Sequence, residues 1–139
     1  MKTILVVDDQ RSFREVVCKQ LNLAGFETVQ AENGLEAITL FDDYQPDLIL
    51  LDIDMPEMDG FEVCRIVRQK SNVPVLFLSG MSDTEHKERG FDLDATDYIT
   101  KDVDRKELIA RVRRWTRSQS TSSISNEEIS DLCVGTLRL

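Results

Sequence analysis

Short apolar runs alternate along the chain with longer amphipathic segments, starting at the N-terminus. Three of the runs are strongly apolar, which is typical of strands buried on both faces of a sheet, and two are more polar, which indicates edge strands. The five predicted strands are Thr3–Val7, Phe26–Gln30, Asp47–Leu51, Val73–Leu78 and Asp97–Thr100, and the second and fifth are the predicted edges. The alternation predicts five βα repeats and a parallel sheet.

The segments between the strands carry apolar residues at helical spacing, as in Phe13, Val17 and Leu21. Four helix starts are predicted where a capping side chain precedes an acid by three residues, as in a capping box. These pairs are Ser12 with Glu15, Asn33 with Glu36, Ser82 with Glu85, and Asp104 with Glu107. Gly25 and Pro46 are predicted to stop the first two helices.

This order of elements predicts an α/β fold, a doubly wound (βα)5 three-layer sandwich of the flavodoxin-like class with parallel sheet order 2-1-3-4-5. In such a sheet, ligands bind beyond the carboxyl ends of the strands. The folded domain is predicted to span residues 1–117, because the composition shifts to Ser and Thr from Ser118 to Ser125. Residues 118–139 would then be a flexible linker followed by the start of a truncated second domain.

Composition narrows the class of protein. The chain has 139 residues, of which 41% are hydrophobic and 31% charged, as expected for one soluble globular domain. No apolar run reaches the roughly 18–20 residues of a membrane-spanning helix and no signal peptide is indicated, so we expect a cytoplasmic protein without a membrane partner. The net charge of −9 opposes direct binding to nucleic acid. The three widely spaced cysteines fit neither a disulfide framework nor a CxxC metal site.

Three acids directly follow predicted strands: Asp8 and Asp9 come after the first strand, and Asp52 after the third. If these strands are neighbours, the three carboxylates crowd one crevice and need a cation or a proton between them. A hard divalent ion with oxygen ligands, Mg²⁺ (or Mn²⁺), suits such a crevice and can also bind a phosphate group. Acids that merely face solvent are the alternative, and that alternative explains a single Asp better than three.

Two further polar residues follow the fourth and fifth strands, namely Ser79 and Lys101. A hydroxyl and an ammonium beside an aspartyl carboxylate can stabilise the oxygens of a phosphoryl group. The sequence therefore predicts a phosphoryl-transfer site at the carboxyl edge of the sheet. The only histidine, His86, lies in a polar run after the fourth strand, so a donor histidine would belong to another protein.

From about residue 2 to residue 117, the chain resembles the receiver domains of bacterial response regulators. The matching motifs are Ile4–Asp9, Leu50–Gly60, Phe77–Gly80 and Asp97–Lys101. The resemblance implies that Asp52 is the phosphoacceptor. It also implies that Asp9 binds the metal directly, that Asp8 acts mainly through a metal-bound water, and that the backbone carbonyl of Asp54 completes the protein's metal ligands.

The same resemblance assigns Ser79 and Lys101 to the phosphoryl group and makes Tyr98 the aromatic residue that swings inward in the switch. The protein would be a signalling switch phosphorylated by a sensor histidine kinase, not an enzyme beyond self-phosphorylation from acyl phosphates and autodephosphorylation. One position departs from the pattern, because Asp102 replaces the proline that normally follows the lysine in a cis peptide. A non-proline cis bond costs about 3–4 kcal/mol, so a trans or rearranged loop is expected, which bears on the reach of Lys101.

The last predicted helix resembles that of regulators whose output is a winged-helix DNA-binding domain, and the tail Val134–Leu139 is similar to the first strand of that domain. In that subclass, phosphorylation promotes a homodimer through charge pairs on the face formed by the fourth helix, fifth strand and fifth helix. Asp97 with Arg111 or Arg113 are the candidate pairs. These arginines would equally suit a solvated helix C-terminus. DNA contact would require an output domain outside this chain.

Two other functions fit part of the pattern. One is a receiver that regulates a non-DNA effector or a partner protein. The other is a haloacid-dehalogenase-like phosphatase, because Asp52-Ile53-Asp54 matches the DxD motif of that family. There the motif usually lies on the first strand and is followed two residues on by Thr or Val, whereas here it lies on the third strand and runs into Met55 and Pro56.

Overall fold

The structure, a computed structural model, describes residues 1–80, 92 and 95–122, with side chains to residue 117. In chain order the elements are β1 (Thr3–Val7), α1 (Arg11–Leu23), β2 (Glu27–Ala31), α2 (Gly34–Tyr44), β3 (Leu48–Leu51), α3 (Gly60–Arg68), β4 (Val75–Ser79), β5 (Asp97–Thr100) and α5 (Arg105–Ser122). The predicted helix start at Ser82 and Glu85, and His86, lie outside the described residues.

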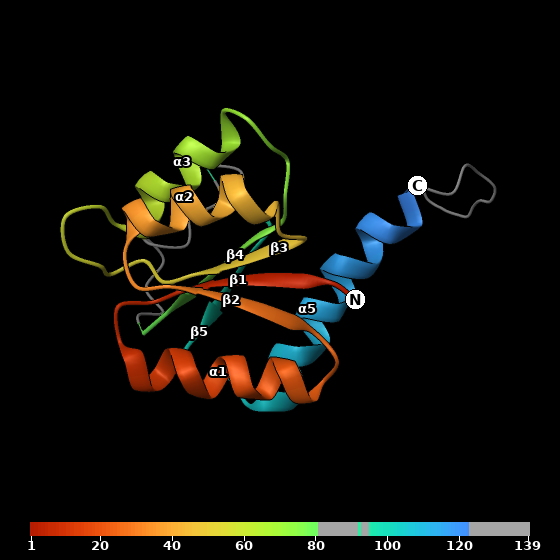
Figure 1. The fold of residues 1–139 in the computed structure, drawn as a ribbon. Coiled ribbons are helices and arrows are strands. Elements are labelled where there is room, and N and C mark those ends of the chain that lie inside the picture. The colour runs from red at the N-terminus through yellow and green to blue at the C-terminus, as the bar shows by residue number, and fades with distance from the viewer. Residues whose placement is uncertain (81–91, 93–94, 123–139) are drawn as a thin grey trace.

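The five strands form one parallel sheet in the order β2-β1-β3-β4-β5, which confirms the predicted topology and both predicted edges. Val7 pairs with Ala31 on one side and with Leu51 on the other, so β1, β2 and β3 end side by side. The helices α2 and α3 cover one face of the sheet, and α1 and α5 cover the other (Figure 1). The fold is therefore the expected doubly wound sandwich.

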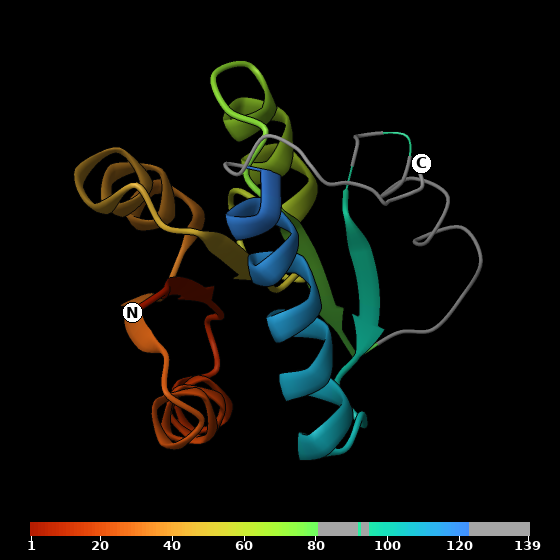
Figure 2. The ribbon, with the colours of Figure 1, turned by 90° about the vertical axis from the view of Figure 1, so that its right-hand side faces the viewer.

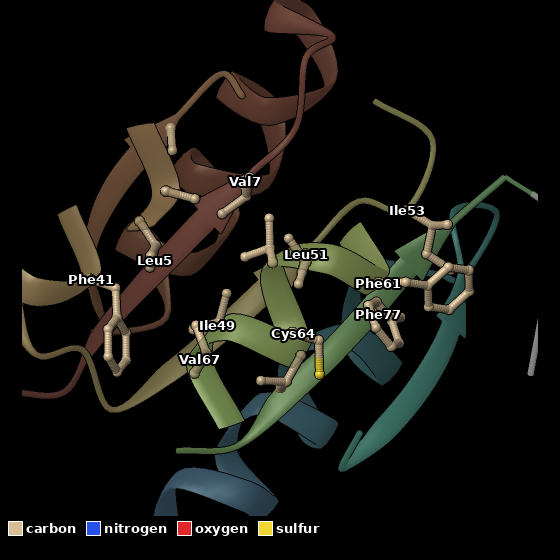
Figure 3. Close-up of a cluster of buried hydrophobic side chains, with 14 of the residues drawn as sticks. Leu5, Val7, Phe41, Ile49, Leu51, Ile53, Phe61, Cys64, Val67 and Phe77 are labelled. Carbon is tan, nitrogen blue, oxygen red and sulfur yellow. The ribbon is translucent and has the colours of Figure 1, made fainter. Parts of the chain in front are cut away.

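Each face of the sheet has its own hydrophobic core. Figure 3 shows the core under α2 and α3, in which Leu5, Ile49 and Phe77 of the strands belong to one buried cluster with side chains of these two helices. The rings of Phe61 and Phe77 meet edge to face with centroids 5.2 Å apart. Burial of each such side chain stabilises the fold by roughly 1.5–3 kcal/mol, so these two layers fix the strands whose ends carry the polar residues.

Two of the predicted helix caps are confirmed. The side chains of Asn33 and Asp104 accept hydrogen bonds from the backbone N–H groups three residues on, at 2.8 and 2.9 Å. The prediction at Ser12 is wrong, because α1 already begins at Arg11 and its N-cap, Gln10, makes no side-chain capping bond. The Gln10 N–H instead donates to the carboxylate of Asp8, which turns the chain into the helix before Ser12 is reached.

The capping box of α3 was not predicted from the sequence. The Asp59 carboxylate accepts from the Glu62 N–H at 3.0 Å, and the Glu62 carboxylate accepts from the Asp59 N–H at 3.2 Å. This box satisfies orphan N–H donors at the start of α3 and sets where the helix begins. It thereby fixes the position of the loop that leads from β3.

The C-terminal ends of α1 and α5 agree only in part with the prediction from the sequence. Gly25 has a φ of +100°, the left-handed conformation expected just after α1. At the far end, α5 continues to Ser122, into the stretch predicted as a linker from Ser118 (Figure 2). Extending an existing helix needs no new nucleus, so polar residues with modest propensity can continue it.

The cysteines and the lengths of the helices complete the description of the fold. Cys18 and Cys64 are buried thiols within the two cores, and Cys133 lies outside the described residues. In the described part of the chain, no helix combines the length and the apolar character needed to cross a bilayer.

Candidate functional site

The carboxyl ends of β1 and β3 bring three acids together. The Asp52 N–H donates to the carbonyl of Val7 at 2.9 Å, which extends the β1–β3 pairing by one residue and sets Asp52 beside Asp8. One carboxylate oxygen from each of Asp8, Asp9 and Asp52 lies within 4.8 Å of the other two. Asp8 and Asp52 are each 2% exposed, whereas Asp9 is exposed to solvent. The acids expected in one crevice are therefore neighbours.

Lys101 reaches into this crevice from the end of β5. Its Nζ lies 2.9 Å from Asp8 Oδ2 and 3.3 Å from Asp52 Oδ1, so one ammonium serves two buried carboxylates. The same Nζ lies 4.7 Å from the centroid of the Phe13 ring, a cation–π distance. The backbone N–H of Lys101 donates to the carbonyl of Ser79 at 2.7 Å, which joins the ends of β4 and β5.

The loop after Lys101 contains no cis peptide bond, as expected from Asp102 in place of proline. The Thr100 hydroxyl donates to the carboxylate of Asp102, and the Val103 N–H donates to the carbonyl of Thr100 at 3.1 Å. These two bonds close a tight turn from β5 toward α5. The Lys101 side chain therefore reaches both buried acids although the peptide bond that follows it is trans.

Ser79 and Tyr98 lie deeper than the acids. Ser79 ends β4, is fully buried, and pairs across the sheet with Thr100. Tyr98 is buried within the core under α2 and α3, where its ring meets Phe77 edge to face at 6.4 Å. Ser79 is thus placed at the same sheet edge as the acids, while the Tyr98 ring belongs to the hydrophobic layer behind it.

Burial dominates the acid–base chemistry of the crevice. It raises the pKa of Asp52 to about 7, the Asp8 charge adds to the rise, and Lys101 only partly offsets it. For Lys101, burial lowers the pKa, but the hydrogen bond to Asp8 and the charge of Asp52 outweigh this and the pKa is raised overall. Without a metal, Asp52 is therefore partly protonated near neutral pH beside a firmly charged lysine.

The loop after Asp52 approaches the acceptor residue very closely. The Gly60 N–H donates to the carbonyl of Ile53 at 2.9 Å. A Cβ built on Gly60 would lie only 2.3 Å from the backbone oxygen of Asp52. In the same loop, Asp54 is exposed and Glu57 has a left-handed φ of +71°. Gly60 is a supporting residue that sequence reasoning did not identify, although it ends the Leu50–Gly60 motif.

The residues proposed for a dimer face are not all together. Arg111 Nη1 lies 3.0 Å from Asp97 Oδ1, so this pair forms within the chain. Arg111 also pairs with Glu107 at 2.8 Å, on the preceding turn of α5. Arg113 instead donates to the carbonyl of Ala24 at 3.1 Å, at the end of α1. Asp97 and Arg111 therefore share a face that Arg113 does not join.

The three carboxylates form a donor set suited to a hard divalent cation. Hard cations prefer oxygen ligands, and three acids against one lysine leave the crevice with excess negative charge. Asp9 is the most accessible of the three and opens the crevice to solvent. The residues present therefore fit Mg²⁺ by their chemistry, and a bound cation would favour the ionised form of Asp52, whose pKa is raised by burial and by the charges of Asp8 and Asp9.

Comparisons with known proteins show which proteins this chain resembles. A probable transcriptional regulator ycf27 of Cyanophora paradoxa is 36% identical over 99% of this chain and 59% of its own length. The DNA-binding dual master transcriptional regulator RpaA of Synechocystis is 39% identical over 84% of this chain and 50% of its own length. The receiver domain of the Francisella response regulator 1452 superposes with a TM-score of 0.81 at 32% identity, covering 86% of this chain and 99% of that one.

The chain thus spans about half the length of the curated relatives it matches. The family model of the response regulator receiver domain matches residues 4–113, which contain all of the sheet except Thr3 and all the acids of the crevice. Sequence, fold and sheet-edge chemistry agree, and this chain belongs to the response regulator receiver domains of two-component signalling.

Proposed function

We propose that this receiver accepts a phosphoryl group on Asp52, in the presence of Mg²⁺, from the phosphohistidine of a sensor kinase. One observation carries the proposal: a buried carboxylate shares a crevice with two further acids and a lysine, at the open edge of a parallel sheet. An isolated buried carboxylate would be costly, so this cluster favours a chemical role over a purely structural one.

The transfer converts the Asp52 carboxylate into an acyl phosphate. An Asp52 oxygen attacks phosphorus, the bond from phosphorus to the donor nitrogen or oxygen breaks, and the leaving group takes that electron pair. Asp52 must be ionised to attack, and its raised pKa opposes this. Lys101, 3.3 Å from Asp52 Oδ1, favours the ionised form and is placed to pair with phosphoryl oxygens.

The metal would be held by Asp9 and Asp52 directly, by Asp8 through water, and by the backbone carbonyl of Asp54. When bound, Mg²⁺ supplies positive charge that neutralises both the nucleophile and the incoming phosphoryl group. The chain contributes the orientation of the acids, which comes from the β1–β3 pairing. It also contributes the ammonium of Lys101, which is already charged before any ligand arrives.

The switch would connect the crevice to the far side of β5. Ser79 lies at the end of β4, where its hydroxyl could bind a phosphoryl oxygen and shift the chain toward it. Tyr98 lies on the adjacent strand, with its ring in the core. We propose that movement of Ser79 changes the packing of Tyr98 and so alters the face that includes β5 and α5, on which Asp97 and Arg111 lie.

The output is proposed from the relatives. Several are named transcriptional regulators, and one is named a DNA-binding regulator. Since this chain corresponds to about half of their length, a DNA-binding output would belong to a segment beyond the receiver. The protein would then act in the cytoplasm and dimerise on phosphorylation through the face of Asp97 and Arg111. A receiver acting on a non-DNA partner would share all of the crevice chemistry.

Intact mass after incubation with Mg²⁺ and acetyl phosphate tests the acceptor. The parent should gain one phosphoryl group, and Asp52→Asn should gain none. Asp42→Asn is the matched control, because Asp42 is an exposed acid on α2 whose carboxylate pairs with Lys70. A gain in the Asp52→Asn protein, or equal gain without a divalent cation, would contradict the proposal. Repeated turnover of phosphoesters would instead favour the haloacid-dehalogenase-like alternative.

A further inference from the structure

One arginine is buried beside the acid crevice without being part of it. Arg14, on the first turns of α1, is only 8% exposed. Its Nη1 donates to the backbone carbonyl of Asp8 at 2.7 Å, and its Nε donates to the side-chain oxygen of Gln30 at 2.8 Å. A charged side chain at this depth is costly unless its donors are satisfied, so its placement requires an explanation.

The Asp8 carbonyl that accepts from Arg14 lies between the two acids at the end of β1. The Asp8 N–H is already bound to the carbonyl of Ala31 at 3.1 Å. The Asp8 carbonyl belongs to the peptide plane between Asp8 and Asp9, so the bond from Arg14 fixes the orientation of the plane that both acids share. The direction of the two carboxylates depends on that plane.

Arg14 is itself held from two sides. Gln30 lies on the edge strand β2, opposite Val6 in the sheet register, and fixes one end of the guanidinium. The backbone N–H of Arg14 donates to the carbonyl of Gln10 at 3.0 Å, and the Gln10 N–H donates to the Asp8 carboxylate at 2.8 Å. The planar guanidinium thus clamps the β1–α1 loop against β2, a geometry that a lysine cannot reproduce.

From these contacts we infer that Arg14 is a positioning residue, which presets Asp8 and Asp9 for the divalent cation of the proposed function. Its hydrogen bond is to the backbone carbonyl of Asp8, so it acts on the acids through the main chain. Partners that orient metal ligands typically contribute about 10–100-fold to metal affinity when removed. The inference rests on the proposed function, because it presumes that these acids bind Mg²⁺.

Calorimetric titration of the unphosphorylated chain with Mg²⁺ tests the inference. We expect Arg14→Met to weaken Mg²⁺ binding by about tenfold or more and Arg14→Lys to restore little of it, because the loss is of geometry and not only of charge. Gln30→Leu should weaken binding by a smaller factor, about threefold, since it frees only one end of the clamp. The Mg²⁺ concentration for half-maximal phosphorylation by acetyl phosphate should rise by the same factors.

Arg11→Met is the matched control. Arg11 lies one turn earlier on α1, is exposed and pairs with Glu15, so this variant removes the same charge without touching Asp8. Its Mg²⁺ affinity should stay within about twofold of the parent. Parent-like affinity in folded Arg14→Met, or in Gln30→Leu should Arg14→Met fail to fold, would overturn the inference. Full recovery in Arg14→Lys would overturn it too, while a parent chain that binds no Mg²⁺ would refute the proposed function itself.

Discussion

Two aspartates of this fold each face a basic side chain, but their charges are satisfied to different degrees. Asp97 lies at the amino end of β5, where its carboxylate accepts from Arg111 at 3.0 Å, from the Tyr98 N–H at 2.8 Å and from the Trp115 indole at 3.3 Å. Its side chain is 22% exposed, whereas that of Asp52 is 3% exposed. Asp97 therefore has three hydrogen-bond donors and is partly open to solvent.

Asp52 lies at the opposite edge of the sheet and shares its basic partner, Lys101, with Asp8. The single ammonium of Lys101 lies closer to Asp8 than to Asp52, at 2.9 and 3.3 Å, and Asp9 adds a third negative charge nearby. Burial, together with the charges of Asp8 and Asp9, raises the pKa of Asp52 to about 7. An ion pair alone therefore does not identify a functional site. A carboxylate with enough donors, such as Asp97, holds structural elements together, whereas a crowded carboxylate whose charge is only partly neutralised, such as Asp52, can bind a ligand.

The largest expected effect comes from filling the space behind Asp52. In Gly60→Ala, the new methyl group would meet the Asp52 backbone oxygen at 2.3 Å. Alanine normally stabilises a helix relative to glycine by roughly 0.5–1 kcal/mol, but here we expect a loss of about 3 kcal/mol or more in the free energy of unfolding. Urea unfolding measures it. Gly80→Ala is the control, because a methyl group at that position would have nothing within 4 Å, and a similar loss there would remove the steric explanation.

The second effect is on pH dependence. The pKa of Asp52 rises from its ordinary 3.8 to about 7 on folding. Between these two pH values, the carboxyl therefore binds more protons in the folded than in the unfolded state. The free energy of unfolding should therefore fall as the pH rises through this window. In Asp52→Asn that fall should be weaker, so without metal the variant should be more stable than the parent by about 2–4 kcal/mol at pH 8 and similar to it near pH 4.

Saturating Mg²⁺ should reverse this order, because the variant lacks one of the proposed metal ligands and a cation stabilises most the folded protein that binds it most tightly. Thermal unfolding of both proteins, with and without Mg²⁺ across the same pH range, gives all four comparisons. If the parent and Asp52→Asn showed the same pH dependence without metal, the crowding of Asp52 would not be a significant cost to the fold.

Most of the fold followed from the sequence, because hydrophobic period and strand order depend on local pattern and simple packing rules. β1 and β5 have the predicted bounds, and the other strands differ by one or two residues. The error at Ser12 had a physical cause. Asp8, directly after β1, accepts from the Gln10 N–H, and this turn starts α1 before Ser12 can cap it.

The sequence predicted the acids of the crevice but not the residues that position them. Asp8, Asp9 and Asp52 follow strands directly, so the parallel sheet brings them together. Gly60 and Arg14 support them across the fold, and nothing in the residues next to them along the chain reveals a contact with Asp52 or with the Asp8 carbonyl. Such contacts depend on how the loops close in three dimensions, which hydrophobic periodicity does not encode.

The third effect tests the satisfied carboxylate. Asp97→Asn keeps the size of the side chain but removes the charge that pairs with Arg111 and replaces one acceptor oxygen with a donor. We expect a loss of about 1–2 kcal/mol in the free energy of unfolding at pH 7, opposite in sign to Asp52→Asn. The emission of Trp115, the only tryptophan, should shift because its indole loses an ionised partner. Equal signs for the two variants would contradict the comparison.

The smallest effect concerns the second partner of Arg111. Glu107 lies one turn earlier on α5, 2.8 Å from Arg111 Nη2, and its side chain is 51% exposed. Exposed pairs at this spacing contribute roughly 0.3–0.5 kcal/mol and are screened by salt. Glu107→Gln should therefore cost less than about 0.5 kcal/mol in low salt and almost nothing at about 1 M salt, whereas the loss in Asp97→Asn should persist because its bonds are partly buried. A salt-resistant loss above about 1 kcal/mol in Glu107→Gln would mean that Arg111 is held mainly by its own helix, and that Asp97 is satisfied chiefly by Trp115 and the backbone.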